Sequence, residues 1–426
     1  MGHITSKNYL DLQKRLDKAP QGVPTSDALF KILEILFTEE EAKYVSVLPF
    51  KCFSPQKAAK IWKLSLPHAK KILNNLAEKG LLVDLNKGDK QLYVLAPSMA
   101  GFFEFSLMRT DGKFDRKILS ELYYQYINVE HDFVEQVLGI TPPVVRTIVH
   151  ETAIQKKHET EVLDYERATH VIKTATCIGV GDCYCRHKMH HMGKACDMPI
   201  KVCLTFNNCA KSLTKHGIAK KISKKKAKEI LDDCIKLGLV QIGDNIQEGL
   251  AFMCNCCGCC CEALLAYKEL GYKKINETNF YAEVGNKCIG CGICEKKCPV
   301  DAIKIKKVKG KKVAHVLLDR CIGCGVCTRF CPTKTLLLER RSDLKQIPRD
   351  TFERFIMSAI EQNKLQNLIF DNYTIWTNEM FRRLFGFLFS LKPAKKLLAS
   401  KQLQSKFFDA CLKGKNSKFF NKLINK

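Results

Sequence analysis

The chain has 426 residues, of which 46% are hydrophobic, and its formal net charge is +26 because 70 lysines and arginines outnumber 44 aspartates and glutamates. This length and hydrophobic content are sufficient for several domains with cores of their own, which excludes a small scaffold held together by disulfides. The 23 cysteines therefore indicate metal ligands or redox groups in a reducing compartment. The positive charge suits acidic partners such as nucleic acid, anionic lipid or an acidic redox protein, although lysines spread along the whole chain also fit a generally lysine-rich composition.

Neither secretion nor a membrane span is indicated by the sequence. The first residues, MGHITSKNYLDLQKRLDKAP, lack the apolar segment of a signal peptide. No uncharged apolar run reaches the roughly eighteen residues that a transmembrane helix requires. We therefore expect a cytoplasmic protein.

Residues 1–115 are predicted to form a winged-helix-like domain. Helical periodicity runs through DALFKILEILFTEEEAKYVSVL, SPQKAAKIWKL and LPHAKKILNNLAEKG, and LLVDLNKGDKQLYVLAP then alternates as a hairpin around Gly88. The polar side chains that would face nucleic acid in such a fold are His68, Lys70, Lys71, Asn74, Lys87 and Lys90. The segment contains little arginine, and winged helices also serve as protein docking modules, so protein contact or scaffolding is preferred over DNA binding.

Residues 116–172 are predicted to be a helical connector, with LSELYYQYINVEHDFVEQVLG as the most strongly periodic segment. Neither a Walker motif nor a dinucleotide fingerprint occurs in the sequence. No catalytic motif is found in the connector either. The sequence supports neither a flavin nor an ATP site.

Residues 173–279 are expected to form one cysteine-rich domain with a metal site. The segment CIGVGDCYCRHKMHHMGKACDMPIKVCLTFNNC and the segment MCNCCGCCCE flank a predicted helix, from about Ser223 to near Gly238, and a short strand. That helix and strand are sufficient to fold the second cysteine group back onto the first. Cys234 lies within the helix and is expected to be a packed thiol.

Three interpretations of the cysteine-rich domain remain open. One or two additional iron–sulfur clusters are preferred, because the domain runs directly into the repeated motifs CIGCGICEKKCP and CIGCGVCTRFCP, which resemble those of ferredoxins and would exchange electrons with it. A structural zinc site that uses CYC and two later cysteines is one alternative, and a redox-active thiol or disulfide centre is another. Arg186 and Lys188 would lower the pKa of neighbouring thiols. His187, His190 and His191 are expected to be solvated or to support ligands by hydrogen bonds.

Residues 280–341 contain one cysteine pattern twice, as CIGCGICEKKCP and CIGCGVCTRFCP. The spacing CxxCxxCxxxCP resembles that of the bacterial two-cluster ferredoxins, which implies a ferredoxin-like βαβ domain with two four-iron four-sulfur (4Fe-4S) clusters. By that resemblance, one cluster is held by Cys288, Cys291, Cys294 and Cys331, and the other by Cys321, Cys324, Cys327 and Cys298. The glycines inside the motifs let backbone amides approach the sulfides, and VDAIKIKKVKGKKVAHVLLD is predicted to be a hairpin around Gly310. Structural zinc would instead require paired CxxC knuckles.

Residues 342–426 are predicted to form a basic helical tail. From Trp376 onward, twelve lysines and arginines stand against Glu379 and Asp409, and apolar residues recur at helical spacing. Helices packed on the core with solvated lysines are preferred. Contact with an anionic membrane surface is the alternative, and it would place the protein at a membrane periphery.

The combination of motifs resembles the anaerobe-associated dicluster ferredoxin-domain proteins. The matching segments are CYCRHKMHHMGKACDMPIKVCLTF, CNCCGCCCEAL and NFYAEVGNKCIGCGICEKKCP, within about residues 165–341. The resemblance implies a pool of metal ligands made up of Cys183, Cys185, Cys196, Cys203, Cys254, Cys256, Cys257, Cys259, Cys260 and Cys261. Cys177 and Cys209 lie outside the shared pattern. CCG also resembles the cysteine-rich modules of heterodisulfide reductases, but the long-range spacing of those modules is missing.

The predicted fold class is α+β, with the five segments described above. The leading hypothesis is an iron–sulfur electron-transfer protein, a subunit or partner of an anaerobic oxidoreductase, which relays electrons through two 4Fe-4S clusters and a further cysteine-ligated centre. Its partners would be redox proteins, with nucleic acid less favoured. The alternatives are a redox-sensing transcription regulator that uses the winged helix, and a thiol-reducing enzyme at the central cysteines. No catalytic residue is assigned, and a non-catalytic carrier or subunit is preferred over an enzyme.

Overall fold

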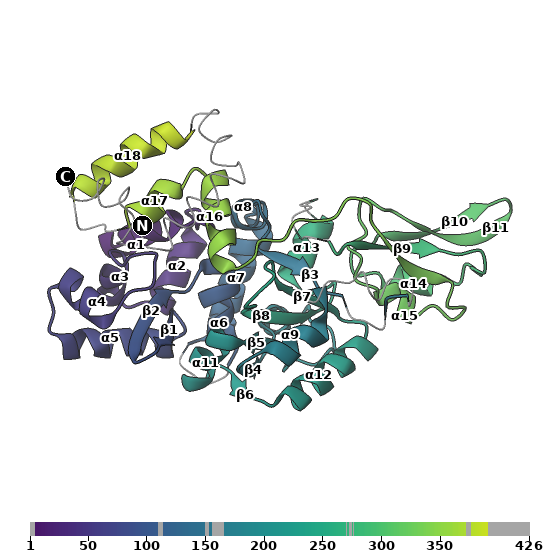
Figure 1. Ribbon diagram of the computed structural model, residues 1–426, viewed down its shortest axis with the longest axis horizontal. Helices are drawn as coiled ribbons and strands as arrows, with labels where there is room; N and C mark the ends of the chain where they lie inside the picture. Colours follow the sequence, from purple (N-terminus) through teal and green to yellow (C-terminus); the bar gives the residue numbers. More distant parts are fainter. Residues whose placement is uncertain are drawn as a thin grey trace.

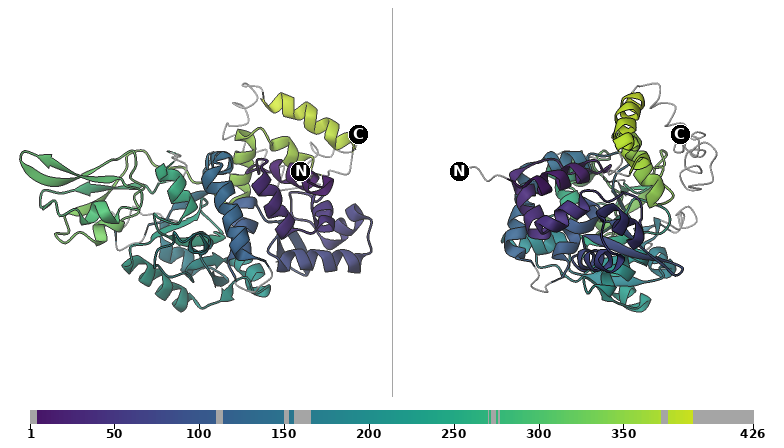
Figure 2. Two further views of the ribbon diagram at one scale, coloured as in Figure 1. Left: turned by 180° about the vertical axis from the view of Figure 1, so that it is seen from behind. Right: turned by 90° about the vertical axis from the view of Figure 1, so that its left-hand side faces the viewer.

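The computed structural model describes residues 5–109, 114–149, 153–155, 166–269, 271, 275, 277–371 and 376–390. It is a mixed α+β structure with several antiparallel sheets. Figure 1 shows N-terminal helices and a hairpin at one end, a six-stranded sheet in the middle, and a long two-stranded hairpin at the far end. Figure 2 shows the C-terminal helices lying over the N-terminal ones, so the chain returns to its starting end.

The N-terminal part consists of small helices followed by a hairpin, in the predicted order. These elements are α1 (Lys7–Asp17), α2 (Asp27–Leu36), α3 (Glu39–Val45), α4 (Pro55–Trp62), α5 (Leu66–Glu78), β1 (Leu82–Lys87) and β2 (Lys90–Leu95). The periodic segment predicted after Asp27 is divided into α2 and α3, because Thr38 and Glu41 form a capping box that starts a new helix. The hairpin turns at Gly88, whose φ of 58° lies in the left-handed region.

The predicted recognition helix α5 exposes His68, Lys70 and Lys71 to solvent. Asn74 is engaged within the protein, because its side-chain oxygen accepts a hydrogen bond of 2.6 Å from the Tyr93 hydroxyl of β2. The amide of Asn74 therefore ties α5 to the hairpin.

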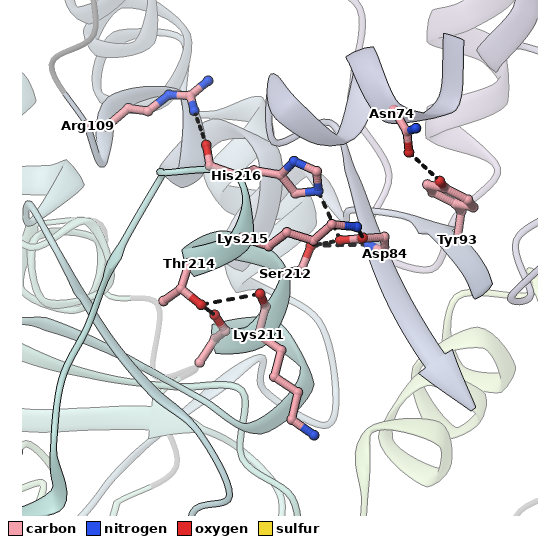
Figure 3. Close-up of polar contacts among 10 residues, drawn as sticks. Asn74, Asp84, Tyr93, Arg109, Lys211, Ser212, Thr214, Lys215 and His216 are labelled. Atoms are coloured by element: carbon pink, nitrogen blue, oxygen red, sulfur yellow. Dashed lines mark hydrogen bonds and ion pairs between the residues drawn. The ribbon is translucent and has the colours of Figure 1, made fainter. Parts of the chain in front are cut away.

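The hairpin docks onto helix α11 (Asn207–Lys215) of the cysteine-rich segment (Figure 3). The buried Asp84 carboxylate of β1 accepts hydrogen bonds from Ser212 at 2.6 Å and from the His216 ring at 3.1 Å, and it also binds Lys215. Burial by itself would raise the pKa of Asp84, but these three partners outweigh it and hold the pKa well below the ordinary range of a carboxyl group. The hairpin thus serves as an internal contact between two parts of the chain.

Residues 98–109 and 114–138 form an aromatic helical layer between the N-terminal helices and the sheet. The elements are η1 (Ser98–Phe102), α6 (Phe103–Leu107), α7 (Arg116–Tyr124), η2 (Gln125–Val129) and α8 (Asp132–Leu138). Phe103 packs against Tyr123, Tyr126 and Phe133, with ring centroids 4.8–6.2 Å apart. The predicted helical connector ends with α8, since the β-branched run that follows forms strand β3 (Val145–Thr147) of the sheet.

The central sheet has the strand order β3-β7-β8-β5-β4-β6, and every pair in it is antiparallel. Its other strands are β4 (Ile178–Gly181), β5 (Cys203–Phe206), β6 (Lys220–Lys221), β7 (Val240–Asp244) and β8 (Phe252–Cys256). Besides α11, the chain between β3 and β9 contains the helices α9 (Ala168–Thr174), α10 (Tyr184–His191), α12 (Lys224–Lys236) and α13 (Glu262–Glu269). The predicted helix and strand between the two cysteine segments are confirmed as α12 and β7.

The repeated cysteine motifs lie between two antiparallel strand pairs. β9 (Phe280–Val284) pairs with β12 (Leu336–Arg340), and β10 (Ile303–Val308) pairs with β11 (Lys311–Val316). The short helices α14 (Ile293–Lys297) and α15 (Val326–Arg329) follow the first cysteines of each motif. The hairpin predicted around Gly310 is confirmed.

The C-terminal segment continues as α16 (Thr351–Glu361), α17 (Leu365–Ile369) and α18 (Trp376–Ser390). Lys364 donates a hydrogen bond of 2.6 Å to the carbonyl of Asp17, and Asn367 donates one of 3.1 Å to that of Lys18. These bonds hold the segment on the end of α1. The predicted basic tail beyond residue 390 lies outside the described residues. No helix in the described part of the chain is long and apolar enough to span a bilayer.

We predict that Asp84→Asn loosens the hairpin from α11. The substitution removes the charge that Lys215 and His216 face, at a cost of about 1–3 kcal/mol for a buried charged hydrogen-bonding group. Because the pKa of Asp84 is depressed, its contribution is complete above the ordinary carboxyl pKa of about 4 and is lost only as the pH falls below that value. Amide hydrogen exchange at neutral pH should therefore accelerate in β1 and α11.

The matched control is Asp89→Asn, which changes the same functional group at an exposed position of the hairpin turn. Equal exchange rates in the two variants would contradict a docking role for Asp84.

Candidate metal centre

The local structure of the cysteine-rich segment directs its thiols to different sides. Cys183 is the N-cap of α10, with Cys185 in the first turn, and Cys203 begins β5. In MCNCCGCCCE, Cys254 and Cys256 are two residues apart on β8 and therefore lie on one face of the sheet. Cys257 follows with the opposite orientation, and the turn at residues 258–260 leads into α13. Six clustered thiols are thus divided by strand alternation and a tight turn.

Four cysteines form a compact cluster, which we call the four-thiol group: Cys196, Cys257, Cys259 and Cys260. Their Sγ atoms all lie within 4.8 Å of one another. The Cys196 sulfur is 3.5 Å from that of Cys257 and 3.9 Å from that of Cys260, and the sulfurs of Cys259 and Cys260 are 3.7 Å apart. Cys196 follows α10, so the two cysteine-rich segments meet here as predicted.

The spacing of the four-thiol group matches a single tetrahedral ion. A metal–sulfur bond of about 2.3 Å gives a tetrahedron with edges of about 3.8 Å. In a cubane each thiolate binds a different iron, which spreads the sulfurs farther apart. Among the described residues, the eight cysteines of the ferredoxin motifs form no group this compact. The four-thiol group therefore differs from the ferredoxin motifs in the spacing of its sulfurs.

Arg186 supplies positive charge to the four-thiol group. This buried side chain donates hydrogen bonds to the Pro199 carbonyl, to the Asn255 carbonyl at 3.3 Å and to the Cys257 sulfur at 3.5 Å. Hydrogen bonding from Cys260 and then from Arg186, opposed by burial, lowers the pKa of the Cys257 thiol to about 4. These donors favour the thiolate form of Cys257, which is the form that binds metal.

The other six cysteines of the predicted ligand pool form a string of neighbours, which we call the sheet-side thiol group: Cys183, Cys185, Cys203, Cys254, Cys256 and Cys261. Hydrogen bonds from Cys203 and Cys256 lower the pKa of Cys254 to about 5, against the effect of burial. Hydrogen bonds from Cys185 and Cys256 likewise lower the pKa of Cys261. All ten cysteines of the predicted ligand pool therefore belong to one of two groups.

The remaining central candidates lie outside both groups. The His187 ring bonds the carbonyl of Leu107 through Nδ1 at 2.7 Å, and its Nε2 is 3.3 Å from that of His191. Neither these rings nor His190 belong to a metal-binding cluster among the described residues. Cys234 is 1% exposed in the core beside Val202 and Leu239, which confirms that it is a packed thiol.

The second ferredoxin motif surrounds a cavity. Cys298, Cys321, Cys324 and Cys327 line it together with apolar residues, and the cavity is partly open to solvent. Two of these sulfurs accept backbone hydrogen bonds, Cys298 from Ala302 at 3.2 Å and Cys321 from Ala282 at 3.4 Å. Thiolate ligands and a largely apolar wall with a few amide donors are what a buried iron–sulfur cluster requires.

The first ferredoxin motif lies nearer the surface. Cys294 is buried, whereas Cys291 is exposed, and Cys288 accepts a hydrogen bond of 3.4 Å from the amide of Ala314. Gly290 and Gly323 have φ values of 63° and 67° and lie so close to neighbouring backbone that a β-carbon would come within 2.4 Å of a carbonyl oxygen. The glycines thus let each motif pack directly on a neighbouring strand, whereas the predicted approach of their backbone amides to the sulfides stays a prediction.

The central and ferredoxin sites touch each other. Gly258 lies in the loop at residues 257–260, which carries three thiols of the four-thiol group, and it packs on Pro299. A β-carbon on Gly258 would lie 2.5 Å from the Pro299 carbonyl oxygen. Cys256 and Cys261 share a hydrophobic cluster with Val300 and Ile322, against which Cys298 and Cys324 also pack. The central thiols and the second ferredoxin motif thus meet in one hydrophobic cluster.

A buried ion pair joins the two cysteine-rich segments. The Lys188 ammonium group, from α10, contacts the Glu262 carboxylate, from α13, and their side chains are 0% and 2% exposed. Asn128 accepts a hydrogen bond from Lys188 and donates one of 2.8 Å to Glu262. Lys188 was predicted to act on thiols, but in the structure its charge is paired with Glu262. The sequence did not pair these residues, since Asn128 belongs to no motif and Glu262 drew no attention at the end of CNCCGCCCEAL.

Comparison with known proteins identifies one domain of the chain. Residues 287–335 match the family model of the 4Fe-4S dicluster domain. No curated protein and no solved structure matches the chain. The predicted dicluster ferredoxin domain is therefore confirmed over those residues, and the wider family resemblance stays a prediction.

We predict that Lys188→Met strongly destabilises the cysteine-rich domain. The variant leaves the Glu262 carboxylate buried without its counter-charge, which typically costs about 3–5 kcal/mol. The midpoint of chemical denaturation should fall, and the protein should lose central metal. A double variant, Lys188→Met with Glu262→Leu, should recover much of the loss because it removes both charges.

Lys194→Met is the control, because Lys194 contacts the same Tyr124 ring from the solvent-exposed side. It should have little effect. A Lys188→Met protein as stable as this control would show that the ion pair does not hold the segments together.

Proposed function

We propose that this protein is an iron–sulfur electron carrier in which two 4Fe-4S clusters connect an external redox partner to metal centres in the cysteine-rich domain. The observation that carries the proposal is the packing of Gly258 on Pro299, because Pro299 directly follows Cys298, the residue of the first motif that we assign to the second cluster. The dicluster match over residues 287–335 supports the presence of the two clusters.

The ligand sets follow from the motif spacing. We assign Cys288, Cys291, Cys294 and Cys331 to the first cluster, and Cys321, Cys324, Cys327 and Cys298 to the second. The cavity lined by four cysteines supports the second set, since Cys298 lies there with the three cysteines of the other motif. Clusters with four cysteine ligands supply one-electron transfer, and the chain's own residues fix their position, hydrogen bonding and exposure.

The four-thiol group is assigned to a single tetrahedral ion, for which zinc is the best fit. Four thiolates at the edge length of one tetrahedron make a closed site, and a closed zinc site has no redox chemistry. Its role would be to fix the loop at residues 257–260 against Pro299. The guanidinium of Arg186 offsets part of the negative charge of the site.

The external partner is proposed to dock at the first motif. Cys291 is exposed there, and the neighbouring Ile289 side chain is 63% exposed. The amide of Ala314 in β11 binds the Cys288 sulfur, so the β10–β11 hairpin is part of the same site. This hairpin exposes a row of lysines: Lys304, Lys306, Lys307, Lys309, Lys311 and Lys312. An acidic electron-transfer protein fits a surface of this charge.

We predict that Lys306→Glu with Lys307→Glu slows electron transfer from an acidic flavodoxin at least about tenfold at low salt, because steering toward the first cluster is lost. Stopped-flow oxidation of the flavodoxin measures the rate. The difference should shrink in high salt, where a Debye length of about 3 Å at 1 M screens the surface charge.

The matched control is Lys220→Glu with Lys221→Glu, at two exposed lysines of β6. It changes the net charge of the protein by the same amount as the hairpin variant. A similar decrease in this control would show that net charge, rather than the hairpin, governs the rate.

The proposed function itself is tested by metal analysis and reduction. The anaerobically purified protein should contain at least about eight irons per chain and should show paramagnetic signals of two interacting clusters on reduction. Gly258→Ala forces the four-thiol loop away from Pro299 and should slow electron exchange with the central domain while both ferredoxin clusters are retained. A protein with four or fewer irons and no reducible signal would refute the proposal.

A further inference from the structure

We propose that the sheet-side thiol group is a separate metal site that binds an iron–sulfur cluster, distinct from the four-thiol group and from both ferredoxin clusters. This inference deepens the proposed function, because it identifies the redox centre of the cysteine-rich domain. If the four-thiol group holds one redox-inactive ion, electrons that enter this domain need another acceptor.

Strand pairing creates the site. β5 and β8 are antiparallel, with Leu204 opposite Met253, so the next position along the ladder brings Cys203 opposite Cys254. Cys256 lies on the same face of β8 as Cys254. Cys261 and Cys185 approach from the loop before α13 and from α10, and the Lys188–Glu262 ion pair joins those two helices. Five thiols from four segments therefore converge on one side of the sheet, with Cys183 adjacent.

The arrangement of these thiols indicates a cluster of several metals. The thiols are near neighbours in the order Cys203, Cys254, Cys256, Cys261, Cys185, Cys183. Among the described residues, no three of them have all their sulfurs within 4.8 Å, as a single ion requires. Six thiols also outnumber the four ligands of one tetrahedral ion. An iron–sulfur cluster suits a spread set of thiolates, because its inorganic sulfide bridges the irons.

The position of the site suits electron exchange with the second ferredoxin cluster. Cys256 and Cys261 are 5% and 6% exposed and belong to the same hydrophobic cluster as Val300 and Ile322, where Cys298 and Cys324 also pack. In the proposed step the reduced second cluster loses one electron and the sheet-side cluster gains it, with no bond made or broken. The four-thiol group lies beside this path of electron transfer, and its metal ion would fix the loop at residues 257–260.

The test is the iron, zinc and sulfide content of the full chain, purified anaerobically, for the wild type and two double variants. The wild type should contain about four irons more than the eight of the ferredoxin clusters, plus one further metal ion. Cys254→Ser with Cys256→Ser should return iron and sulfide to about eight and keep the single ion. Cys196→Ser with Cys259→Ser should lose the single ion and keep the additional iron.

Two results would overturn the inference. One is a wild-type protein with about eight irons and eight sulfides per chain. This measurement does not depend on whether a variant folds. The other is a Cys254/Cys256 variant with unchanged iron. Either result removes the redox centre assigned to the cysteine-rich domain but leaves the proposed electron-carrier role of the two ferredoxin clusters intact as long as their eight irons are present. Fewer than eight irons would count against that carrier role instead.

Discussion

The buried contact between Lys188, Asn128 and Glu262 is the interaction on which the proposed central metal sites depend. It joins α10, which carries Cys185, to α13, which begins directly after Cys261. A charge pair this deeply buried contributes little net stability compared with apolar packing, but either member alone would be costly. The contact therefore selects the one arrangement of the two helices in which both charges are paired. That arrangement brings thiols from distant segments of the chain together.

The division of the six thiols in MCNCCGCCCE follows from local geometry. Strand alternation places Cys254 and Cys256 on one face, and the turn that contains Gly258 sends Cys257, Cys259 and Cys260 to another. Each set is completed from the CYC segment and its neighbours. One run of sequence can thus serve two centres of different kinds, a compact one next to Arg186 and a spread one next to the ferredoxin core.

The ferredoxin part was predictable from the sequence because cluster ligation imposes local spacing. The two CxxCxxCxxxCP motifs and the hairpin around Gly310 were predicted, and the family match and strands β10 and β11 agree. Cys234 was likewise predictable as a packed thiol, since it lies on the buried face of an amphipathic helix. The partition of the central cysteines was not predictable. It depends on the register of β5 against β8 and on a charge pair between residues 74 positions apart, neither of which leaves a local pattern. The strand β3, the partners of Lys188 and the docking of Asp84 on α11 were missed for the same reason.

Anomalous diffraction at the iron and zinc edges, from crystals of the anaerobically purified protein, tests the central claim most directly. The account predicts one isolated metal atom, with the zinc signal, at the centre of Cys196, Cys257, Cys259 and Cys260. It also predicts iron at three places: within each ferredoxin ligand set and among the sheet-side thiols. A cubane bound by the four-thiol group, or the absence of metal beside Cys254 and Cys256, would contradict the account.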